Sequence, residues 1–277
     1  MLNFLHTFSP TPVLLTIGPI NVYWYGLFLV LGMLGGIFII LKLAEYYCLS
    51  KDLIIDLIFW LIIGGIVGAR IYEVLLEFPY YMSHPIDIFK VWQGGLAIHG
   101  ALIAGLVILY FYTKRHKISF WLVASILAPG AAFGQAIGRW GNYFNQELFG
   151  LPTSSSWGIP INSINRPVQY FYSNYFHPAF LYESVGNIII CGILLILHYK
   201  TSIGKRDHAR IAITYLMLYS FLRFLTEFIR IDKTPIVLGL RLPQIVSLLL
   251  ILGSLVYLRK FHKTTVDLNI KEPALEK

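Results

Sequence analysis

Charged residues are scarce in this sequence, and their scarcity limits the class of protein. Only 13% of its 277 residues are charged, whereas 57% are hydrophobic, and the mean hydropathy is +0.67. So little polar surface cannot cover a soluble globule, which places the chain in a bilayer. Cysteine is scarce too: Cys48 and Cys191 are too few for a disulfide framework, and we expect both to be buried thiols.

Other sequence patterns that are absent narrow the range of possible functions. The sequence has no H-E-x-x-H motif, no Cys and His ligand spacing and no paired aspartates, so we expect no metal and no cofactor. The net charge is +8, but the basic residues form no cluster, which argues against nucleic acid and favours anionic headgroups. No Lys or Arg precedes Lys42, so we expect no cleavable signal peptide.

Long apolar runs are what the chain has instead. Runs near the roughly 20 residues that cross a bilayer lie at 22–41, 53–76, 94–113, 120–137, 179–199, 211–231 and 242–258. Basic residues concentrate in alternate connections, at Lys42 and Lys51, at Lys114, Arg115 and Lys117, at Lys200, Lys205, Arg206 and Arg210, and at Arg259, Lys260 and Lys263. By the positive-inside rule, the N-terminus is outside and the C-terminus cytoplasmic. We therefore predict an all-α integral membrane protein: seven transmembrane helices in a single domain over 1–260, then a cytoplasmic tail at 261–277.

A polar insert interrupts this pattern between the fourth and fifth predicted helices. Residues 139–177 are rich in Asn, Ser, Pro, Tyr and Trp, and they form a longer connection than is usual. The charge bias places the insert on the outer face, where we expect a loop or a small head. At 2–16 we expect a short segment that lies on the outer interface and is held there by Phe4 and Phe8.

The start of this insert is rich in polar and charged side chains. The segment Gly138 to Gly150 reads G-R-W-G-N-Y-F-N-Q-E-L-F-G, and it places Arg139, Asn142 and Glu147 where an apolar helix meets water. An arginine near hydrocarbon depth costs about 3 kcal/mol on insertion scales, so it normally faces a bundle interior or a polar cavity. The segment therefore indicates a binding site.

A histidine lies in the third predicted span. His99 follows the sequence W-Q-G-G at 92–95, and it is the only histidine that we place in the interior of a span. Such a histidine is as often an interhelical hydrogen-bonding residue, here with Ala101 and Gly105 allowing close helix contact, as it is a functional group. The adjacent glycines favour a cavity.

Charged residues also recur in other spans. In the sixth span one helical face carries Tyr219, Arg223, Glu227 and Arg230. Glu227 can neutralise one of the two arginines, and the other needs an anion or a further carboxylate. We interpret Arg70 with Glu73 as a structural pair and Glu183 as a structural partner for one of the arginines.

These motifs, in this order, resemble those of the bacterial prolipoprotein diacylglyceryl transferase family. The resemblance covers nearly the whole chain. It rests on Y-W-Y-G at 23–26, W-Q-G-G through H-G at 92–100, the specific motif G-R-x-G-N-x-x-N-x-E-x-x-G at 138–150, H-P through Y-E at 177–183, and the residues at 219–227. Two positions depart from the family pattern: Ala101 stands where a second glycine often follows His-Gly, and Gln146 where a glycine often precedes the motif glutamate.

The resemblance implies a transferase that moves the diacylglyceryl group of phosphatidylglycerol onto the lipobox cysteine of a prolipoprotein signal peptide. The product is a thioether, glycerol 1-phosphate is released, and lipoprotein maturation begins. It further implies a multi-pass enzyme of the bacterial cytoplasmic (inner) membrane, with its active site toward the outer face; we expect a monomer. The catalytic candidates are His99, Arg139, Arg223 and Tyr25, and those for binding phosphatidylglycerol are Arg139, Asn142, Glu147, Gly150, Tyr219 and Glu227.

The residues suit this chemistry. Displacing a phosphodiester at an sp3 carbon requires a thiolate, and a free cysteine, with a pKa of about 8.5, is mostly protonated at neutral pH. His99, with a reference pKa of about 6.5, is the candidate base, although an arginine-rich field could lower the cysteine pKa without one. Arg139 and Arg223 are the candidates for stabilising the departing phosphate.

Two other classes of membrane protein stay open. A transporter of anions or lipids would use the same arginines to bind substrate without chemistry. It explains less well the absence of a two-half repeat, the histidine beside glycines and the long outer loop. An intramembrane protease fits less well again, since the sequence has no serine in a G-x-S-x-G setting.

Overall fold

The computed structural model describes residues 2–200, 207–232 and 234–260 of the chain. These residues are mostly helical and include three two-stranded sheets. The contacts divide the chain into two compact units, the first made of 1–34 with 131–277 and the second of 35–130. Helices α2 (Trp24–Tyr46) and α6 (Phe120–Phe144) contribute residues to both units.

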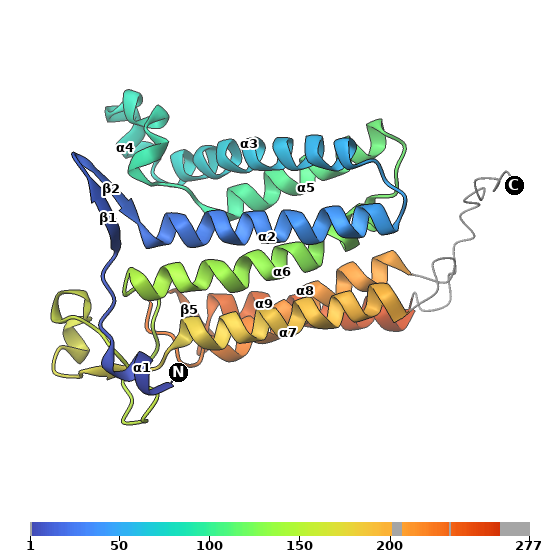
Figure 1. The fold of residues 1–277 in the computed structure, drawn as a ribbon. Helices are drawn as coiled ribbons and strands as arrows, with labels where there is room; N and C mark the ends of the chain where they lie inside the picture. The colour runs from blue at the N-terminus through green and yellow to red at the C-terminus, as the bar shows by residue number, and fades with distance from the viewer. Residues whose placement is uncertain (1, 201–206, 233, 261–277) are drawn as a thin grey trace, which may run out of the picture. The chain divides into compact units, whose positions relative to one another are not determined.

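Each apolar run predicted from the sequence overlaps a long helix (Figure 1). Among the described residues, five helices are long and apolar enough to cross a membrane: α2, α3 (Lys51–Leu76), α6, α7 (Ala179–Lys200) and α9 (Leu242–Lys260). The two others, α5 (Ile98–Arg115) and α8 (His208–Thr226), carry charged residues that lower their hydropathy. The chain is thus a helical membrane protein.

In the second unit, α3 and α5 lie side by side in close contact (Figure 1). A Cβ added to Gly100 would lie 2.1 Å from the Gly68 carbonyl oxygen, and one added to Gly68 would lie 2.4 Å from Ala104 Cβ. Small residues therefore let the two backbones touch. Gly105 is not one of the closest contacts, because a Cβ there would have its nearest neighbour 3.9 Å away.

Shorter elements complete the second unit between α3 and α5. These are α4 (Phe78–Ser83) and the 3-10 helices η1 (Pro85–Phe89) and η2 (Val91–Gln93). A small core of Leu57, Leu109, Tyr112 and Val123 fills the space between the helices of this unit. Cys48, which follows α2, is exposed, so the prediction of a buried thiol was wrong there; Cys191 on α7 is buried as predicted.

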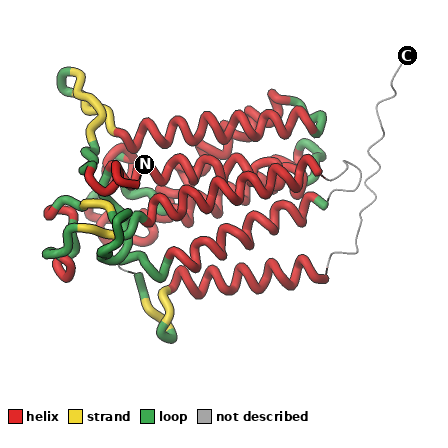
Figure 2. Tube along the Cα trace, turned by 60° about the horizontal axis from the view of Figure 1, so that its bottom comes forward, coloured by secondary structure: helices red, strands yellow, loops and turns green. Residues whose placement is uncertain are grey.

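In the first unit, α8 packs against both α7 and α9. Three antiparallel hairpins accompany these helices: β1 (Val13–Ile17) with β2 (Ile20–Tyr23), β3 (Ile159–Pro160) with β4 (Tyr175–Phe176), and β5 (Ile236–Val237) with β6 (Leu240–Arg241). The strands and most of the loops of this unit lie at one end of its helices (Figure 2). The predicted site residues of this unit, from the motif at 138–150 and from the end of α8, gather at this end.

The polar insert begins later than predicted, because α6 continues to Phe144. Arg139 and Asn142 therefore lie on the last turns of a helix. The residues after α6 fold into a small head with β3, β4 and the 3-10 helices η3 (Ser163–Asn165) and η4 (Val168–Tyr170). Its buried core consists of Leu5, Tyr143, Phe149, Ile159, Ile161, Phe176 and Phe180.

The N-terminal segment packs on this head through Leu5, His6 and Phe8. In α1 (Leu2–Thr7), the Leu5 side chain is buried, and His6 Nδ1 lies 2.7 Å from the Gly158 carbonyl oxygen. Phe8 packs against the head core, and Phe4 is 58% exposed. The placement of this segment on the outer interface stays a prediction.

Candidate functional site

Glu183, near the start of α7, holds three arginines of the first unit. Its Oε2 lies 2.6 Å from Arg139 Nε, and its Oε1 lies 3.0 Å from Arg230 Nη1 and 3.6 Å from Arg223 Nη1. The carboxylate is only 5% exposed, and a buried charge is tolerated only with such partners. The predicted pairing of Glu183 with an arginine is confirmed, and it involves three arginines instead of one.

Glu227 forms the second centre of this network, directly after the end of α8. Its fully buried Oε2 lies 2.8 Å from Arg223 Nη2 and its Oε1 lies 3.1 Å from Arg241 Nε. Arg241, on β6, also donates to the main-chain carbonyls of Glu227, Arg230 and Asp232. The prediction that Glu227 neutralises an arginine of its own stripe is confirmed.

The stripe itself does not continue along α8, which ends at Thr226. Arg230 follows the helix and turns to Glu183 and to Asp232, whose Oδ2 lies 2.5 Å from Arg230 Nη2. We call these seven charged residues the Glu183 cluster: Arg139, Glu183, Arg223, Glu227, Arg230, Asp232 and Arg241.

The Glu183 cluster carries one positive charge in excess, because four arginines face three carboxylates. Its arginines differ in exposure. The side chains of Arg139, Arg223 and Arg241 are 22%, 21% and 18% exposed, whereas that of Arg230 is 5% exposed. The excess charge is therefore accessible to an anion through these three arginines.

The motif at the end of α6 connects this cluster to the head. Arg139 Nη1 donates to Asn142 Oδ1 at 3.2 Å, and Asn142 Nδ2 donates to Glu147 Oε1 at 2.8 Å. Asn142 is buried, while Glu147 is exposed. The structure thus brings together three of the predicted binding residues in one hydrogen-bonded chain.

Gln146, which stands where the resemblance predicts a glycine, has a backbone conformation that favours glycine. Its φ is +52°, in the left-handed region that favours glycine. Its buried side chain is held at both ends: Nε2 donates to the Pro10 carbonyl at 2.7 Å, and Oε1 accepts from the Asn162 main-chain N–H at 2.7 Å. These two hydrogen bonds offset the backbone cost and tie the turn to the N-terminal segment and the head.

Gly150 ends the motif where two segments meet closely. Its N–H donates to the His177 carbonyl at 2.9 Å, and it forms an antiparallel bridge with Arg230. A Cβ at this position would lie 2.8 Å from His177 Cβ and 3.0 Å from the Ile229 carbonyl oxygen. Only glycine fits without a shift, so Gly150 fixes the backbone that carries Arg230.

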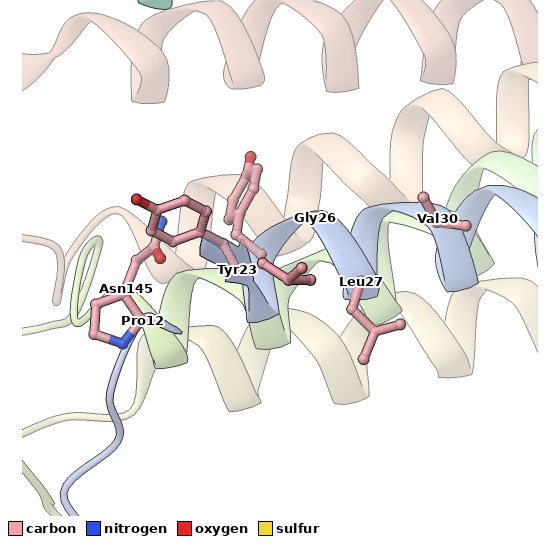
Figure 3. Close-up of a pocket in the computed structure, with 8 residues that line it drawn as sticks. Pro12, Tyr23, Gly26, Leu27, Val30 and Asn145 are labelled. Carbon is pink, nitrogen blue, oxygen red and sulfur yellow. The ribbon is translucent and has the colours of Figure 1, made fainter. Parts of the chain in front are cut away.

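Tyr25 and Asn145 line an apolar cavity of about 660 Å³ at the start of α2. Figure 3 shows Tyr23, Pro12 and Asn145 near one another, with Leu27 and Val30 further along α2. Tyr25 also packs on the motif helix, since a Cβ at Gly141 would lie 2.7 Å from Tyr25 Cδ2. This predicted residue therefore joins an apolar cavity to the motif.

Tyr219 lies on α8 one turn before Arg223. Its ring centre is 6.1 Å from that of Tyr215, whose hydroxyl donates to Gln135 Oε1 at 3.2 Å. Tyr215 and Gln135 thus connect α8 with α6, the two helices that carry Arg223 and Arg139.

His99 belongs to the second unit and lies in the first turn of α5. Its side chain is exposed, and its ring centre is 5.9 Å from that of Tyr72. The prediction that it lies in the interior of a span was therefore wrong. His198, in the last turn of α7, is the fully buried histidine in the described part of a predicted span.

Arg70 does not form the predicted pair with Glu73. Its buried guanidinium donates to the main-chain carbonyls of Ile88 at 2.9 Å, Gly94 at 2.8 Å and Gly95 at 2.7 Å, and to that of Asp87. The described residues contain no ion pair between Arg70 and Glu73. The reason is that a loop folded over α3 has carbonyls that need donors. Arg70 thereby holds the Gly-Gly turn that precedes His99.

The same loop has an ion pair at its surface. Lys90 and Tyr80 donate hydrogen bonds to the Asp87 carboxylate at 2.6 Å and 2.8 Å. These bonds, that from Lys90 first, lower the pKa of Asp87 below its ordinary value. The loop before α5 is thus fixed both by Arg70 inside and by Asp87 outside.

Comparison with known proteins decides between the classes left open by the sequence. A family model described as prolipoprotein diacylglyceryl transferase matches residues 12–259. The chain belongs to this family. A phosphatidylglycerol–prolipoprotein diacylglyceryl transferase of Nostoc sp. is 42% identical over 250 residues, which is 89% of this chain and 87% of the relative. One of Synechocystis sp. is 40% identical over 268 residues, covering 94% and 93%.

Membership in the prolipoprotein diacylglyceryl transferase family makes this chain an enzyme and sets aside the transporter and the protease. The list of site residues predicted from the sequence omitted four members of the Glu183 cluster: Glu183, Arg230, Asp232 and Arg241. Glu183 was assigned only a structural pairing, and Arg230 was placed only on the charged stripe. The signal for Glu183 was its position at the start of an apolar helix; Arg241 gave no such signal.

Proposed function

We propose that this chain transfers the diacylglyceryl group of phosphatidylglycerol to the lipobox cysteine of a prolipoprotein, and that the Glu183 cluster binds the phosphodiester of the donor. The cysteine sulfur forms a thioether bond as the carbon–oxygen bond to phosphate breaks, and glycerol 1-phosphate leaves. The observation that carries this proposal is the single excess positive charge of the cluster. A phosphodiester carries a single negative charge and would match it.

Arg139 and Arg223 would stabilise the charge that grows on the leaving phosphate. Their guanidinium groups are held by Glu183 and Glu227, so they need little reorganisation when the bond breaks. Arg139 uses Nε for Glu183 and Nη1 for Asn142, which leaves N–H groups free for a phosphate oxygen. Tyr219 and Glu227 would complete the site from the side of α8, and Asn142, Glu147 and Gly150 from the motif.

We propose His99 as the base that removes the proton of the cysteine thiol. Its exposed ring at the start of α5 is accessible to a group outside the unit, which supports this role. The carbonyls bound by Arg70 hold the turn before it. Tyr25, which lines the apolar cavity at the start of α2, would contact the diacylglyceryl group, because the walls of that cavity suit an acyl chain.

We further propose that α5 and α8 also cross the membrane, giving seven spans with the N-terminus outside and the C-terminus cytoplasmic. Lys51, Arg115 and Lys200 lie at helix ends that this orientation places in the cytoplasm. The motif, the head and the Glu183 cluster would then face the outer side of the bacterial cytoplasmic membrane. Residues 205, 206 and 261–277, with Lys205, Arg206, Lys263 and the predicted tail, lie outside the described residues. A monomer suffices, since one chain supplies the whole cluster.

The test uses purified protein in detergent, a lipobox peptide and phosphatidylglycerol, with the mass of the peptide as the readout. We expect the peptide to gain one diacylglyceryl group, and Arg139→Ala to lose this activity. Arg259→Ala is the matched control, because Arg259 is exposed in the last turn of α9 and belongs to no part of the site. A folded wild-type protein that leaves the peptide mass unchanged would refute the proposed function.

A further inference from the structure

A second cavity lies in the other unit, between α3 and α5. It measures about 480 Å³, and it is found where α3 begins and α5 ends. Its lining combines apolar and polar side chains: Asp56, Trp60, Ile108, Phe111, Tyr112, Arg115 and His116. None of these residues belongs to the Glu183 cluster or to the motif at 138–150. We call this cavity the α3–α5 groove.

The polar end of the α3–α5 groove holds a guanidinium without an ion-pair partner among the described residues. Arg115 is exposed and forms no ion pair with any described carboxylate. The neighbouring His116 ring stacks on Tyr112, with ring centres 4.2 Å apart. Tyr112 in turn donates its hydroxyl hydrogen to Asp56 Oδ2 at 2.9 Å. A fixed aromatic pair thus holds a histidine beside an unpaired guanidinium.

The other end of the groove is apolar. Trp60 and Phe111 are 48% and 61% exposed, and Ile108 lies between the two helices. In a membrane protein such surfaces face lipid chains, and tryptophan is common at the level of the headgroups. At one end the groove has basic side chains suited to a phosphate, and at the other end it has an apolar surface suited to an acyl chain.

We propose that the α3–α5 groove binds one molecule of phosphatidylglycerol as a resident lipid, separately from the donor substrate. Its phosphate would accept hydrogen bonds from Arg115 and His116, and its acyl chains would lie on Trp60 and Phe111. Asp56, the one carboxylate in the lining, would accept hydrogen bonds from the glycerol hydroxyls of the headgroup. Lys117, which follows His116, adds a positive field that favours an anionic headgroup over a zwitterionic one.

The position of Arg115 also has a simpler explanation, which the experiment must separate from lipid binding. A cation in the last turn of a helix complements the helix dipole, and basic residues at helix ends set topology. Lys114 satisfies both explanations equally, yet its Nζ lies over the ring of Tyr110, 5.9 Å from its centre, and outside the lining. Lys114 and Arg115 are both basic and both lie at the end of α5, but only Arg115 lines the groove. Lys114 is therefore a matched control.

The test is photo-crosslinking of the full chain in detergent with a photoactivatable phosphatidylglycerol, followed by peptide mapping. We expect crosslinks in residues 56–60 and 108–116 that excess phosphatidylglycerol removes and phosphatidylcholine does not. Arg115→Gln should reduce them about tenfold, as expected for the loss of a charge-assisted hydrogen bond, whereas Lys114→Gln should not.

Both variants should keep the wild-type transferase activity at saturating donor, which separates this inference from the proposed function. An absence of crosslinks in these residues would overturn the proposal. An equal loss in both variants would do the same, because it would show a diffuse surface charge instead of a groove.

Discussion

Replacing Glu183 by glutamine would remove the charge at the centre of the cluster while keeping its shape. Removing one partner of a buried ion pair costs about 3–5 kcal/mol. The loss would be uneven: Arg223 keeps Glu227 at 2.8 Å and Arg230 keeps Asp232 at 2.5 Å, whereas Arg139 loses its carboxylate and keeps Asn142 at 3.2 Å. Because Arg139 and Arg223 are about one-fifth exposed, water screens part of the repulsion, so we expect about 3 kcal/mol.

The catalytic effect of Glu183→Gln should exceed its effect on stability. A displacement of Arg139 by about 1 Å would reduce kcat/KM for phosphatidylglycerol about 100-fold, while KM for the peptide stays unchanged. The assays are denaturant unfolding in detergent and initial rates of diacylglyceryl transfer.

Glu45→Gln is the matched control, because Glu45 pairs with Lys42 at 3.6 Å and Lys51 at 3.3 Å on an exposed surface. It should leave the free energy of unfolding and the transfer rate close to wild type. Wild-type transfer by Glu183→Gln would refute the positioning of Arg139 by Glu183, and equal stability of the two variants would refute the energetic argument.

Three further predictions concern individual site residues. Arg139→Lys keeps the charge but loses the planar fork, so its dissociation constant for phosphatidylglycerol, measured by equilibrium binding, should rise about tenfold; unchanged affinity would exclude a bidentate contact. His99→Asn should abolish transfer in the mass assay while phosphatidylglycerol still binds, and normal turnover would exclude His99 as the base. Gly150→Ala should destabilise the protein by about 1–3 kcal/mol in chemical unfolding, since the new Cβ meets His177 Cβ at 2.8 Å; a wild-type midpoint would show that the backbone adapts.

The helices could be predicted because each apolar run is both long and continuous. Their ends were less accurate, because hydropathy falls before the helix stops. At the end of α6, Arg139 and Asn142 are polar, yet they stay helical because their side chains bond to each other and to Glu147. Composition alone assigned these residues to a loop.

The charge pairs were harder to predict than the helices. Arg70 and Glu73 are one helical turn apart, and that proximity predicts an ion pair. Instead, the Arg70 guanidinium donates its hydrogen bonds to main-chain carbonyls of the loop at 87–95. Glu183 differs from Arg70, because its ion-pair partners are distant from it in the sequence. Local patterns predicted one arginine partner for Glu183, but they could not predict that three arginines converge on it.

The order of charges along the chain gives Arg241 a special place in the biogenesis of this site. Each earlier arginine has a carboxylate to balance it: Glu183 for Arg139, Glu227 for Arg223 and Asp232 for Arg230. During synthesis each of these arginines is followed by its carboxylate, so the lasting positive excess of the cluster arrives only with Arg241 on the last hairpin. A chain that ends before β6 would hold a cluster with no net charge, and it would lack the charge that we propose matches the phosphodiester of the donor lipid.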